Sequence, residues 1–441
     1  MRRRILFFVT IILTALLMTG CAFQTVDEMY ALPKRSEEYK YLQAAIDSSM
    51  SGMEYCAPLS GEHQQAVQMA DLTGDGVEEY LVFAKGSSDK PLQILIFAQG
   101  DDGEAKLLEV IESNGSAFEQ VEYVQVDGIP GFELVIGRQV SDQVLRNVSM
   151  YSFADGNARQ LMSAAYSKFL TCDLDSDACS ELMIIQPGEA DIANAIAVLY
   201  DYRLGEMERS LEAELSRQVG NIKRIMVSKL YNGSPAVYVA SAVDESAIVT
   251  DIFALRNDRF TNISIRTESG TSVQTLRNFY VYSDDVDDDG ILELPSLITM
   301  KPISQDWEQE NQYLIRWFAM DIDGQETDKL YSFHNYVGGW YVQLDSLWAG
   351  RVTVDQFGNT FIFYVWDPEF RELTALFTIY ALTGSDRETQ ATEERRFALH
   401  RTEGVVYAGK LESGAESFGI TEEILINSFR LIYQDWETGE T

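Results

Sequence analysis

Three acidic loops of one design recur along this chain, about a hundred residues apart, and each runs directly into an apolar stretch. Their sequences are DLTGDGVEE at 71–79, DLDSDACSE at 173–181 and DVDDDGILE at 285–293. The stretches that follow, such as YLVF at 80–83 and LMII at 182–185, are rich in residue types that favour strands. A loop-plus-strand unit that recurs in this way indicates a repeat architecture.

Oxygen-bearing side chains occupy positions 1, 3, 5 and 9 of each loop, which is how a short loop wraps a hard cation such as calcium. An EF-hand needs a glutamate at position 12, followed by a helix, and position 12 here is Val82, Ile184 or Ser296. The loops are therefore not EF-hands. The predicted metal-binding residues, with position 7 included, are Asp71, Thr73, Asp75, Val77, Glu79, Asp173, Asp175, Asp177, Cys179, Glu181, Asp285, Asp287, Asp289, Ile291 and Glu293.

Two weaker copies lie between the acidic loops, at 126–135 (VDGIPGFELV) and 230–239 (LYNGSPAVYV). Both keep a glycine-containing turn before an apolar strand, and neither keeps the ladder of carboxylates. With them the period is about fifty residues, the length of one four-stranded propeller blade. Further β-type runs follow the five loops, at 92–97, 148–153, 196–200, 247–253 and 313–318. We therefore expect a mainly β fold, with about five repeats over 65–334 forming a β-propeller.

The pattern D-x-[DNT]-x-D-G-x-x-E before a strand resembles the FG-GAP and VCBS-type repeats of integrin-like propellers. The resemblance implies a propeller with calcium-type loops. Loops 71–79 and 285–293 match the pattern, whereas loop 173–181 has Ala178 where the family has glycine. Ala178 should then adopt a left-handed backbone conformation, at a cost of about 1–2 kcal/mol. Loop 285–293 combines four carboxylates with Gly290 and should bind calcium best.

The N-terminus predicts export and lipid attachment. Residues 2–4 are arginines, residues 5–18 are apolar but too few to span a membrane, and LMTGC at 17–21 resembles the lipobox of bacterial lipoproteins. That resemblance implies a signal peptide at 1–20, acylation of Cys21 and a tether at 21–34. The chain would then be extracytoplasmic and anchored by lipid to the bacterial cell membrane. An uncleaved anchor or a plain secretory signal is the alternative interpretation.

Two further regions flank the repeats. Residues 36–47 have the capping serine, early acids and apolar stripe of a short helix, so 35–64 is expected to be a helical segment packed on the propeller. Strand-like runs after residue 335 end in a helical pattern at 420–430, with Thr421 as its cap. Ile424, Ile426 and Phe429 should face inward there. We expect 335–441 to be a small α+β domain, to which the sequence attaches no activity.

The cysteines leave two possibilities open. Cys172 and Cys179 bracket the middle acidic loop, and an extracytoplasmic compartment would permit a disulfide between them. Two reduced thiols on adjacent turns is the alternative.

The sequence contains none of the common catalytic signatures. Its three histidines are far apart, and it has no G-x-S-x-G elbow, H-E-x-x-H pair or phosphate-binding loop. A net charge of −35 argues against nucleic acid as a partner. We expect a non-enzymatic envelope lipoprotein, a calcium-stabilised scaffold that binds a protein or glycan. The alternative is an extracytoplasmic enzyme, for example a glycan-active one, with paired carboxylates in a pocket away from the three loops.

Overall fold

The structure is a computed structural model that describes residues 37–99, 105–140, 146–154, 156–187, 194–217, 221–243, 247–265, 270–277, 281–300, 313–346, 350–367 and 372–432. Cys21, the predicted signal peptide and the tether lie outside these residues. The described chain is mainly β and forms six antiparallel sheets of four or five strands. Among its helices, none combines the length and the apolar character needed to cross a membrane.

The first three sheets are built from consecutive strands. The first contains β1 (Glu54–Tyr55), β2 (Val67–Ala70), β3 (Glu79–Lys85), β4 (Leu92–Gln99) and β5 (Ala105–Ser113). The second contains β6 (Ala117–Val124), β7 (Glu133–Gln139), β8 (Arg146–Ser152) and β9 (Arg159–Tyr166). The third contains β10 (Lys168–Cys172), β11 (Glu181–Gln186), β12 (Ile196–Arg203) and β13 (Glu206–Glu214).

The remaining sheets also follow in chain order, with two exceptions. A late strand joins the fifth sheet, and the last two strands of the sixth sheet are exchanged in position. The fourth contains β14 (Ile222–Lys229), β15 (Pro235–Ala242), β16 (Ile248–Arg256) and β17 (Arg259–Asn262). The fifth contains β18 (Leu294–Thr299), β19 (Tyr313–Met320), β20 (Glu326–Asn335), β21 (Trp340–Leu344) and the late strand β27 (Phe429–Leu431). The sixth is ordered β22 (Val352–Phe357), β23 (Thr360–Asp367), β24 (Glu372–Leu382), β26 (Val406–Leu411) and β25 (Phe397–Arg401).

The strands are of two kinds, continuous apolar runs and strands with many exposed residues, and burial explains the difference. In the first four sheets the strand after each loop (β3, β7, β11 or β15) is an almost continuous apolar run, and nearly all of its residues are buried. Such runs are typical of strands covered on both faces. The outermost strands β5 and β13 carry many exposed residues instead. The predicted mainly β class is confirmed.

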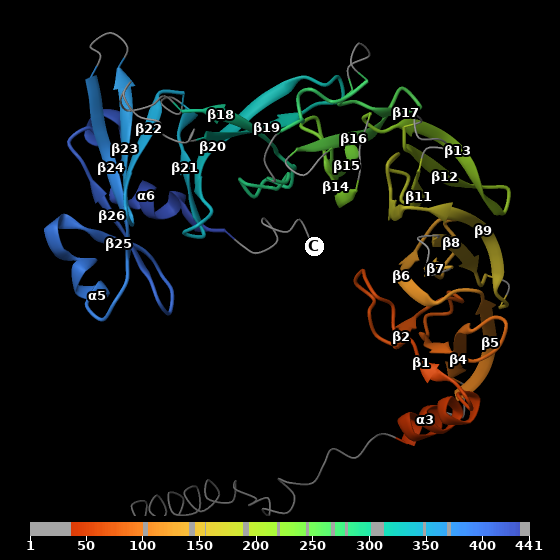
Figure 1. The fold of residues 1–441 in the computed structure, drawn as a ribbon. Helices are drawn as coiled ribbons and strands as arrows, with labels where there is room; N and C mark the ends of the chain where they lie inside the picture. The colour runs from red at the N-terminus through yellow and green to blue at the C-terminus, as the bar shows by residue number, and fades with distance from the viewer. Residues whose placement is uncertain are drawn as a thin grey trace, which may run out of the picture.

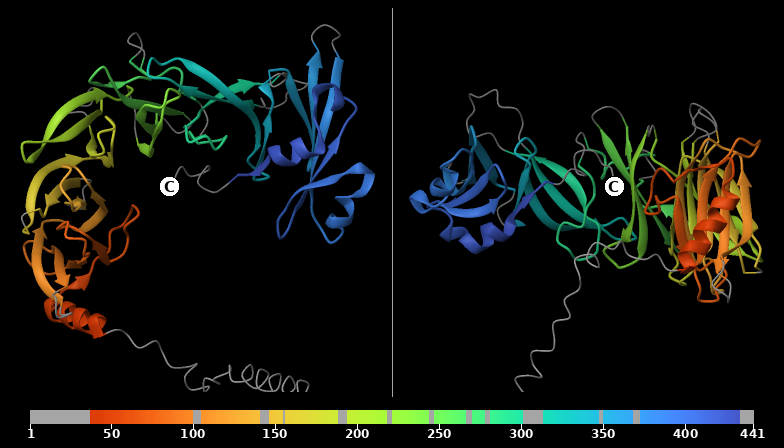
Figure 2. Two further views of the ribbon diagram at one scale, coloured as in Figure 1. Left: turned by 180° about the vertical axis from the view of Figure 1, so that it is seen from behind. Right: turned by 90° about the horizontal axis from the view of Figure 1, so that it is seen from below.

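The sheets pack face to face along an open arc (Figures 1 and 2). Each pair of neighbours shares an apolar cluster; Phe83 of the first sheet, for example, lies in one cluster with Leu134 and Ile136 of the second. Strands β2, β6 and β14 lie on the concave side, and β5, β9 and β13 lie on the convex side (Figure 1). The first and sixth sheets stand at opposite ends of the arc.

The N-terminal helix braces one end of this arc. Helix α3 (Glu37–Ser49) places Leu42 and Ile46 in a cluster with Val82 and Leu95 of the first sheet. The helix predicted at 36–47, and its packing against the first repeat, are confirmed. The helical segment expected to extend to residue 64 ends at Ser49, and β1 pairs with β3 beyond it.

The other end of the arc departs from the expected domain division. Trp340 of β21 is fully buried, and β21 pairs with β20 on one side and β27 on the other. Phe333 and Trp340 of the fifth sheet share one cluster with Phe363 and Phe377 of the sixth. The boundary expected at residue 335 therefore falls between two strands that are hydrogen-bonded to each other. The chain passes from the fifth sheet to the sixth later, between Leu344 and Val352.

Short helices complete this end: α5 (Arg387–Gln390), a 3-10 turn at Glu393–Arg395, another at Glu416–Phe418, and α6 (Glu422–Ser428). Thr421 caps α6 as predicted, because its hydroxyl accepts the Ile424 N–H at 3.2 Å. The predicted inward face is wrong in part. Ile424 is 50% and Ile426 39% exposed, whereas Leu425 and Phe429 are buried.

Candidate cation sites

Each acidic loop is held closed by its own carboxylates. The position-1 aspartate accepts two backbone N–H bonds from across the loop; Asp173, for instance, accepts from Asp177 at 3.2 Å and Ala178 at 3.0 Å. The position-9 glutamate accepts the N–H of position 2, in the pairs Leu72 with Glu79, Leu174 with Glu181, and Val286 with Glu293. Each such oxygen keeps a second lone pair that can bind a cation. The loop shape is thus set by local hydrogen bonds.

The position-7 residues serve this closure through their backbones. Their N–H groups donate to the position-5 carboxylate, in the pairs Val77 with Asp75, Cys179 with Asp177, and Ile291 with Asp289. Position 6 has a positive φ in all three loops: 85° at Gly76, 72° at Ala178 and 81° at Gly290. The predicted left-handed conformation of Ala178 is confirmed.

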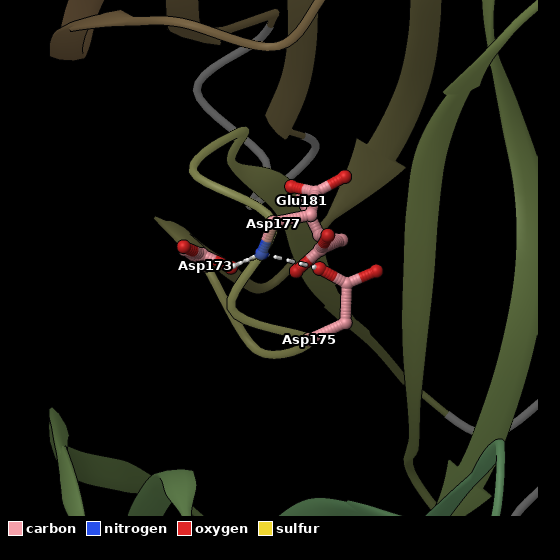
Figure 3. Close-up of side chains that lie close together, drawn as sticks. All are labelled: Asp173, Asp175, Asp177 and Glu181. Atoms are coloured by element: carbon pink, nitrogen blue, oxygen red, sulfur yellow. Dashed lines mark hydrogen bonds between the residues drawn. The ribbon is translucent and has the colours of Figure 1, made fainter.

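Loop 173–181 gathers four carboxylates. One oxygen each from Asp173, Asp175, Asp177 and Glu181 lies within 4.8 Å of the others (Figure 3). In the described part of the chain, no lysine or arginine forms an ion pair with any of them. Burial and the charge of Asp177 raise the pKa of Asp175, and burial raises the pKa of Glu181 to about 7. This loop is crowded with uncompensated negative charge.

Loop 285–293 differs because a lysine side chain from another strand contacts its carboxylates. The Lys329 ammonium, on β20, bonds Asp287 at 3.1 Å and also bonds Asp289, and it lies 3.8 Å from Oε1 of Glu293. That Oε1 is buried and accepts no hydrogen bond within the described structure. Asp285, Asp287 and Asp289 form the remaining cluster. The hydrogen bond from Lys329 holds the pKa of Asp289 below its usual range, opposite to the shift at Asp175.

A β-bulge places Lys329 at the loop. Trp317 pairs with Leu330 and Phe318 pairs with Asp328, which makes Lys329 the extra residue of β20. The same bulge occurs at the same register in the first three sheets, where the extra residues are Leu108, Leu161 and Ser210. These four sheets therefore share one equivalent register position, and only Lys329 among its four residues carries a positive charge.

Loop 71–79 does not gather its acids in this way. The Thr73 hydroxyl donates to Glu79 at 3.1 Å and Gly74 donates to Asp71 at 2.7 Å. Among the described residues, three or more metal-binding side chains converge only at the other two acidic loops. Thr73 therefore acts as an internal hydrogen-bond donor to the carboxylate with which it was expected to share a cation.

The weaker copy at 126–135 is a complete loop that the acidic pattern missed. Gln125 takes the part of the position-1 aspartate and accepts the Gly128 N–H at 2.8 Å. Glu133 accepts the Val126 N–H at 3.1 Å, as the position-9 glutamates do. Burial raises the pKa of Glu133 to about 7. The eight-residue step from Gln125 to Glu133 was the signal in the sequence.

Neighbouring loops are hydrogen-bonded to each other. The Phe132 N–H donates to the Asp71 carbonyl at 2.9 Å, and the Ser180 N–H donates to the Gln125 carbonyl at 2.7 Å. The loops of the first three sheets thus form one row, so order in one loop supports the next.

The cysteines beside the middle loop are free thiols, so the possible disulfide between Cys172 and Cys179 is not present. Cys172 is buried in the cluster between the third and fourth sheets. The Cys179 sulfur lies on the other side of the loop, 3.9 Å from the Cβ position that a side chain on Gly128 would occupy. The two side chains point to different neighbours because they come from the strand end and the loop tip.

Away from the loops, the described residues include a buried histidine and two hollows. His334 is buried, stacks on Tyr341 and has its pKa lowered by burial to about 3, which suits a packing residue. Two hollows of about 310 and 280 Å³ are each lined by one acid, Glu112 and Asp345 respectively, among described residues. Neither brings together the two carboxylates that the enzyme alternative requires.

No family model matches the sequence, and no curated protein matches it. Among solved structures, the exotype rhamnogalacturonan lyase YesX is similar with a TM-score of 0.32 and 14% identity, over 75% of this chain and 67% of the other. Rhamnogalacturonan lyase YesW gives 0.31 and 13%, over 73% and 55%. A protein from Lactobacillus plantarum gives 0.26 and 12%, over 74% and 94%. Scores this low support no conclusion about this chain.

Proposed function

We propose that this protein is a non-enzymatic lipoprotein of the cell envelope, a cation-stabilised β-scaffold that holds a protein or glycan partner. Acylated Cys21 would anchor it to the membrane outside the cytoplasm, and residues 21–34 would be the tether. In this proposal the repeats over 65–334 are propeller blades of the FG-GAP and VCBS type, and calcium has a structural role.

Several features support the blade interpretation. The five sheets of the repeat region each contain at least four antiparallel strands, and each follows its predecessor along the arc. The loops precede β3 in the first sheet, β7 in the second and β11 in the third, and loop 285–293 precedes the first strand, β18, of the fifth. Repeats that stack only on their neighbours suit a binding scaffold, because the extended surface grows with each repeat.

The observation that carries the calcium role is the uncompensated cluster in loop 173–181. Hard oxygen ligands on a short loop suit calcium, and weak sites of about 10⁻⁴–10⁻³ M are typical of extracellular modules. Without a cation, the four carboxylates repel each other within 4.8 Å. We place the strongest site at this loop, and not at 285–293, because Lys329 already compensates part of the negative charge of the latter.

Calorimetric titration with calcium, together with melting in calcium or chelator, tests this proposal. Calcium at tenfold excess over its dissociation constant should stabilise the mature protein by about 1.4 kcal/mol. Asp175→Asn should remove most of this gain, whereas Asp89→Asn, on an exposed turn, should keep it. Equal melting with and without calcium in the parent protein would refute the cation role.

The anchor has its own test. Cys21→Ala should release the protein into the medium or leave it unprocessed, as judged by fractionation and intact mass. A variant that remains in the membrane fraction at the mature mass would rule out lipid attachment at Cys21.

A further inference from the structure

A polar hollow of about 310 Å³ lies where the β3–β4 connection and the end of β5 in the first sheet meet the face of the second. The first sheet contributes Lys90, Glu112 and Ser113. The second contributes a patch of polar side chains from three adjacent strands, namely Arg138, Asn147, Ser149, Tyr151, Gln160 and Ser163. None of these residues belongs to a cation loop.

This patch interrupts an otherwise apolar interface. Leu134 and Ile136, on the same face of β7 as Arg138, pack in the cluster shared with the first sheet. On the opposite face of β8, Val148 and Met150 pack toward the third sheet. At the end where the hollow opens, amide, hydroxyl and guanidinium groups replace the apolar side chains. Polar groups at an inter-sheet face are costly to bury unless they are hydrogen-bonded.

Arg138 is the centre of the patch and is held in place. Its Nη2 donates to Oδ1 of Asn147 and Oγ of Ser149, each at 2.8 Å. Ser163 donates to the same Asn147 oxygen at 3.0 Å. Ser149 is 1% exposed, so the support beneath the guanidinium is rigid and buried.

The guanidinium has no acidic partner. Among the described residues Arg138 forms no ion pair, and its buried Nε lacks an acceptor. Burial lowers the pKa of Arg138, and only the phenols of Tyr151 and Tyr166 oppose that shift. In a chain with 69 acids and 34 lysines and arginines, an unpaired, half-buried arginine is unexpected. A missing carboxylate is the simplest completion, because arginine binds carboxylates through paired hydrogen bonds.

We propose that this hollow binds an acidic sugar unit of a glycan, with the sugar carboxylate on Arg138 and the sugar hydroxyls on the surrounding amides and hydroxyls. Lys90 adds a second positive charge at the rim and Glu112 adds one negative charge, so the lining has a net positive charge. The lining favours a sugar over an acidic peptide, since it offers hydroxyl and amide groups from side chains and few apolar contacts. This inference rests on the proposed function, because it names the class of partner that the scaffold holds.

Ligand-observed NMR titration of the mature protein tests the site with four probes: D-glucuronate, D-glucose, acetate and a triglutamate peptide. Glucuronate should bind at least tenfold more tightly than glucose or acetate, because only it satisfies both the guanidinium and the hydroxyl-binding groups. Equal binding of acetate would reduce the hollow to a simple anion site and overturn the proposal. Tighter binding of triglutamate would overturn it in favour of a protein partner.

Two variants and one control localise the effect. Arg138→Gln should weaken glucuronate binding at least tenfold, while Arg203→Gln, which removes an exposed arginine from β12, should leave it unchanged. Ser163→Asp would supply a carboxylate from within the protein, so it should abolish binding and raise the melting temperature. Unchanged glucuronate binding in Arg138→Gln or Ser163→Asp would refute the site.

The calcium and glycan tests fail independently. Glucuronate binding without any calcium-dependent stabilisation would retain this site and remove the proposed cation role. Calcium stabilisation with no preference for glucuronate would do the reverse.

Discussion

Loops 173–181 and 285–293 have nearly the same pattern of acids and the same backbone closure, yet their charge is balanced differently. In loop 285–293 the Lys329 ammonium contacts Asp287 and Asp289 and lies near Glu293. In loop 173–181 the same register position is Ser210, whose hydroxyl donates to the Leu199 carbonyl at 3.1 Å. In loop 285–293 the counterion is a lysine side chain of the protein itself. In loop 173–181 the described residues supply no such lysine or arginine.

An acidic loop alone therefore does not define a cation site. The decisive residue is the bulge position of the strand two places further along the sheet, about forty residues from the loop 285–293 that it serves. A lysine there provides a permanent cation of fixed position. A neutral residue there leaves the carboxylates to a metal ion or to protonation.

The largest effect is expected from removing the built-in cation. Lys329→Ser should lower the free energy of unfolding in chelator by about 2–3 kcal/mol, because it leaves partly buried carboxylates without a partner. The variant should also gain a calcium-dependent rise in melting temperature, since loop 285–293 then resembles loop 173–181. Chelator and calcium melts check both parts.

Lys410→Ser is the matched control for this substitution, because Lys410 pairs with Glu412 on the surface of the sixth sheet. It should cost at most about 1 kcal/mol and gain no calcium response. If Lys329→Ser behaves like this control, the ammonium does not serve as the counterion of the loop.

The reciprocal exchange should have a smaller effect. Ser210→Lys places an ammonium beside loop 173–181, so it should abolish the calcium-dependent stabilisation of about 1.4 kcal/mol at tenfold excess and raise stability in chelator. Ser228→Lys, on β14, adds the same charge away from the loop and should leave the calcium response intact. Calorimetric titration of the three proteins distinguishes these outcomes. An unaltered heat of calcium binding in Ser210→Lys would contradict the exchange.

Loop 125–133 has fewer acids, because Gln125 and Ile129 stand where the acidic loops have aspartates at positions 1 and 5. Burial raises the pKa of Glu133 to about 7, above its ordinary value of 4.5. The folded state then holds a proton more tightly than the unfolded state, so the contribution of Glu133 to stability is fully present below pH 4.5 and is lost as pH rises through 7. Between pH 6 and 8 this loss amounts to about 1 kcal/mol.

Glu133→Gln should remove that part of the pH dependence, because the amide keeps an acceptor for the Val126 N–H and cannot ionise. Denaturant unfolding at pH 6 and pH 8 measures the slope. An equally steep fall in the variant would show that the carboxyl proton is not linked to folding.

The repeating strands could be predicted from the sequence because both faces of the strand that follows each loop are covered. Burial on both faces of β3, β7, β11 and β15 requires continuous apolar runs, which are visible without a structure. Helix α6 shows the opposite case. Seven residues make about two turns, and the alternating apolar residues at 424 and 426 suggested a face that the packing of Leu425 does not use.

The cation loops were predictable in shape and not in charge balance. Asp173, Asp285 and their hydrogen bonds follow from the local pattern, and so does the strained Ala178. The contact of Lys329 depends on a bulge in a distant strand, and the hollow at Arg138 depends on how two sheets meet. Neither leaves a signal in local spacing.

The smallest change in stability is expected at position 6, where loop 173–181 has an alanine and loop 285–293 has a glycine. Ala178 has a φ of 72°, and Gly290 has 81° at the same position. Ala178→Gly should relieve about 1–2 kcal/mol of left-handed strain and lose part of that gain to the greater freedom of glycine in the unfolded chain, for a net stabilisation of about 0.5–1 kcal/mol. Gly290→Ala should destabilise by a similar amount through strain alone, since nothing lies within 4 Å of the added Cβ. Ala213→Gly, in the extended strand β13, should destabilise, because no strain is relieved there. Chemical unfolding of the three variants in chelator checks the signs, and a destabilised Ala178→Gly would mean that the alanine packs usefully enough to outweigh its backbone strain.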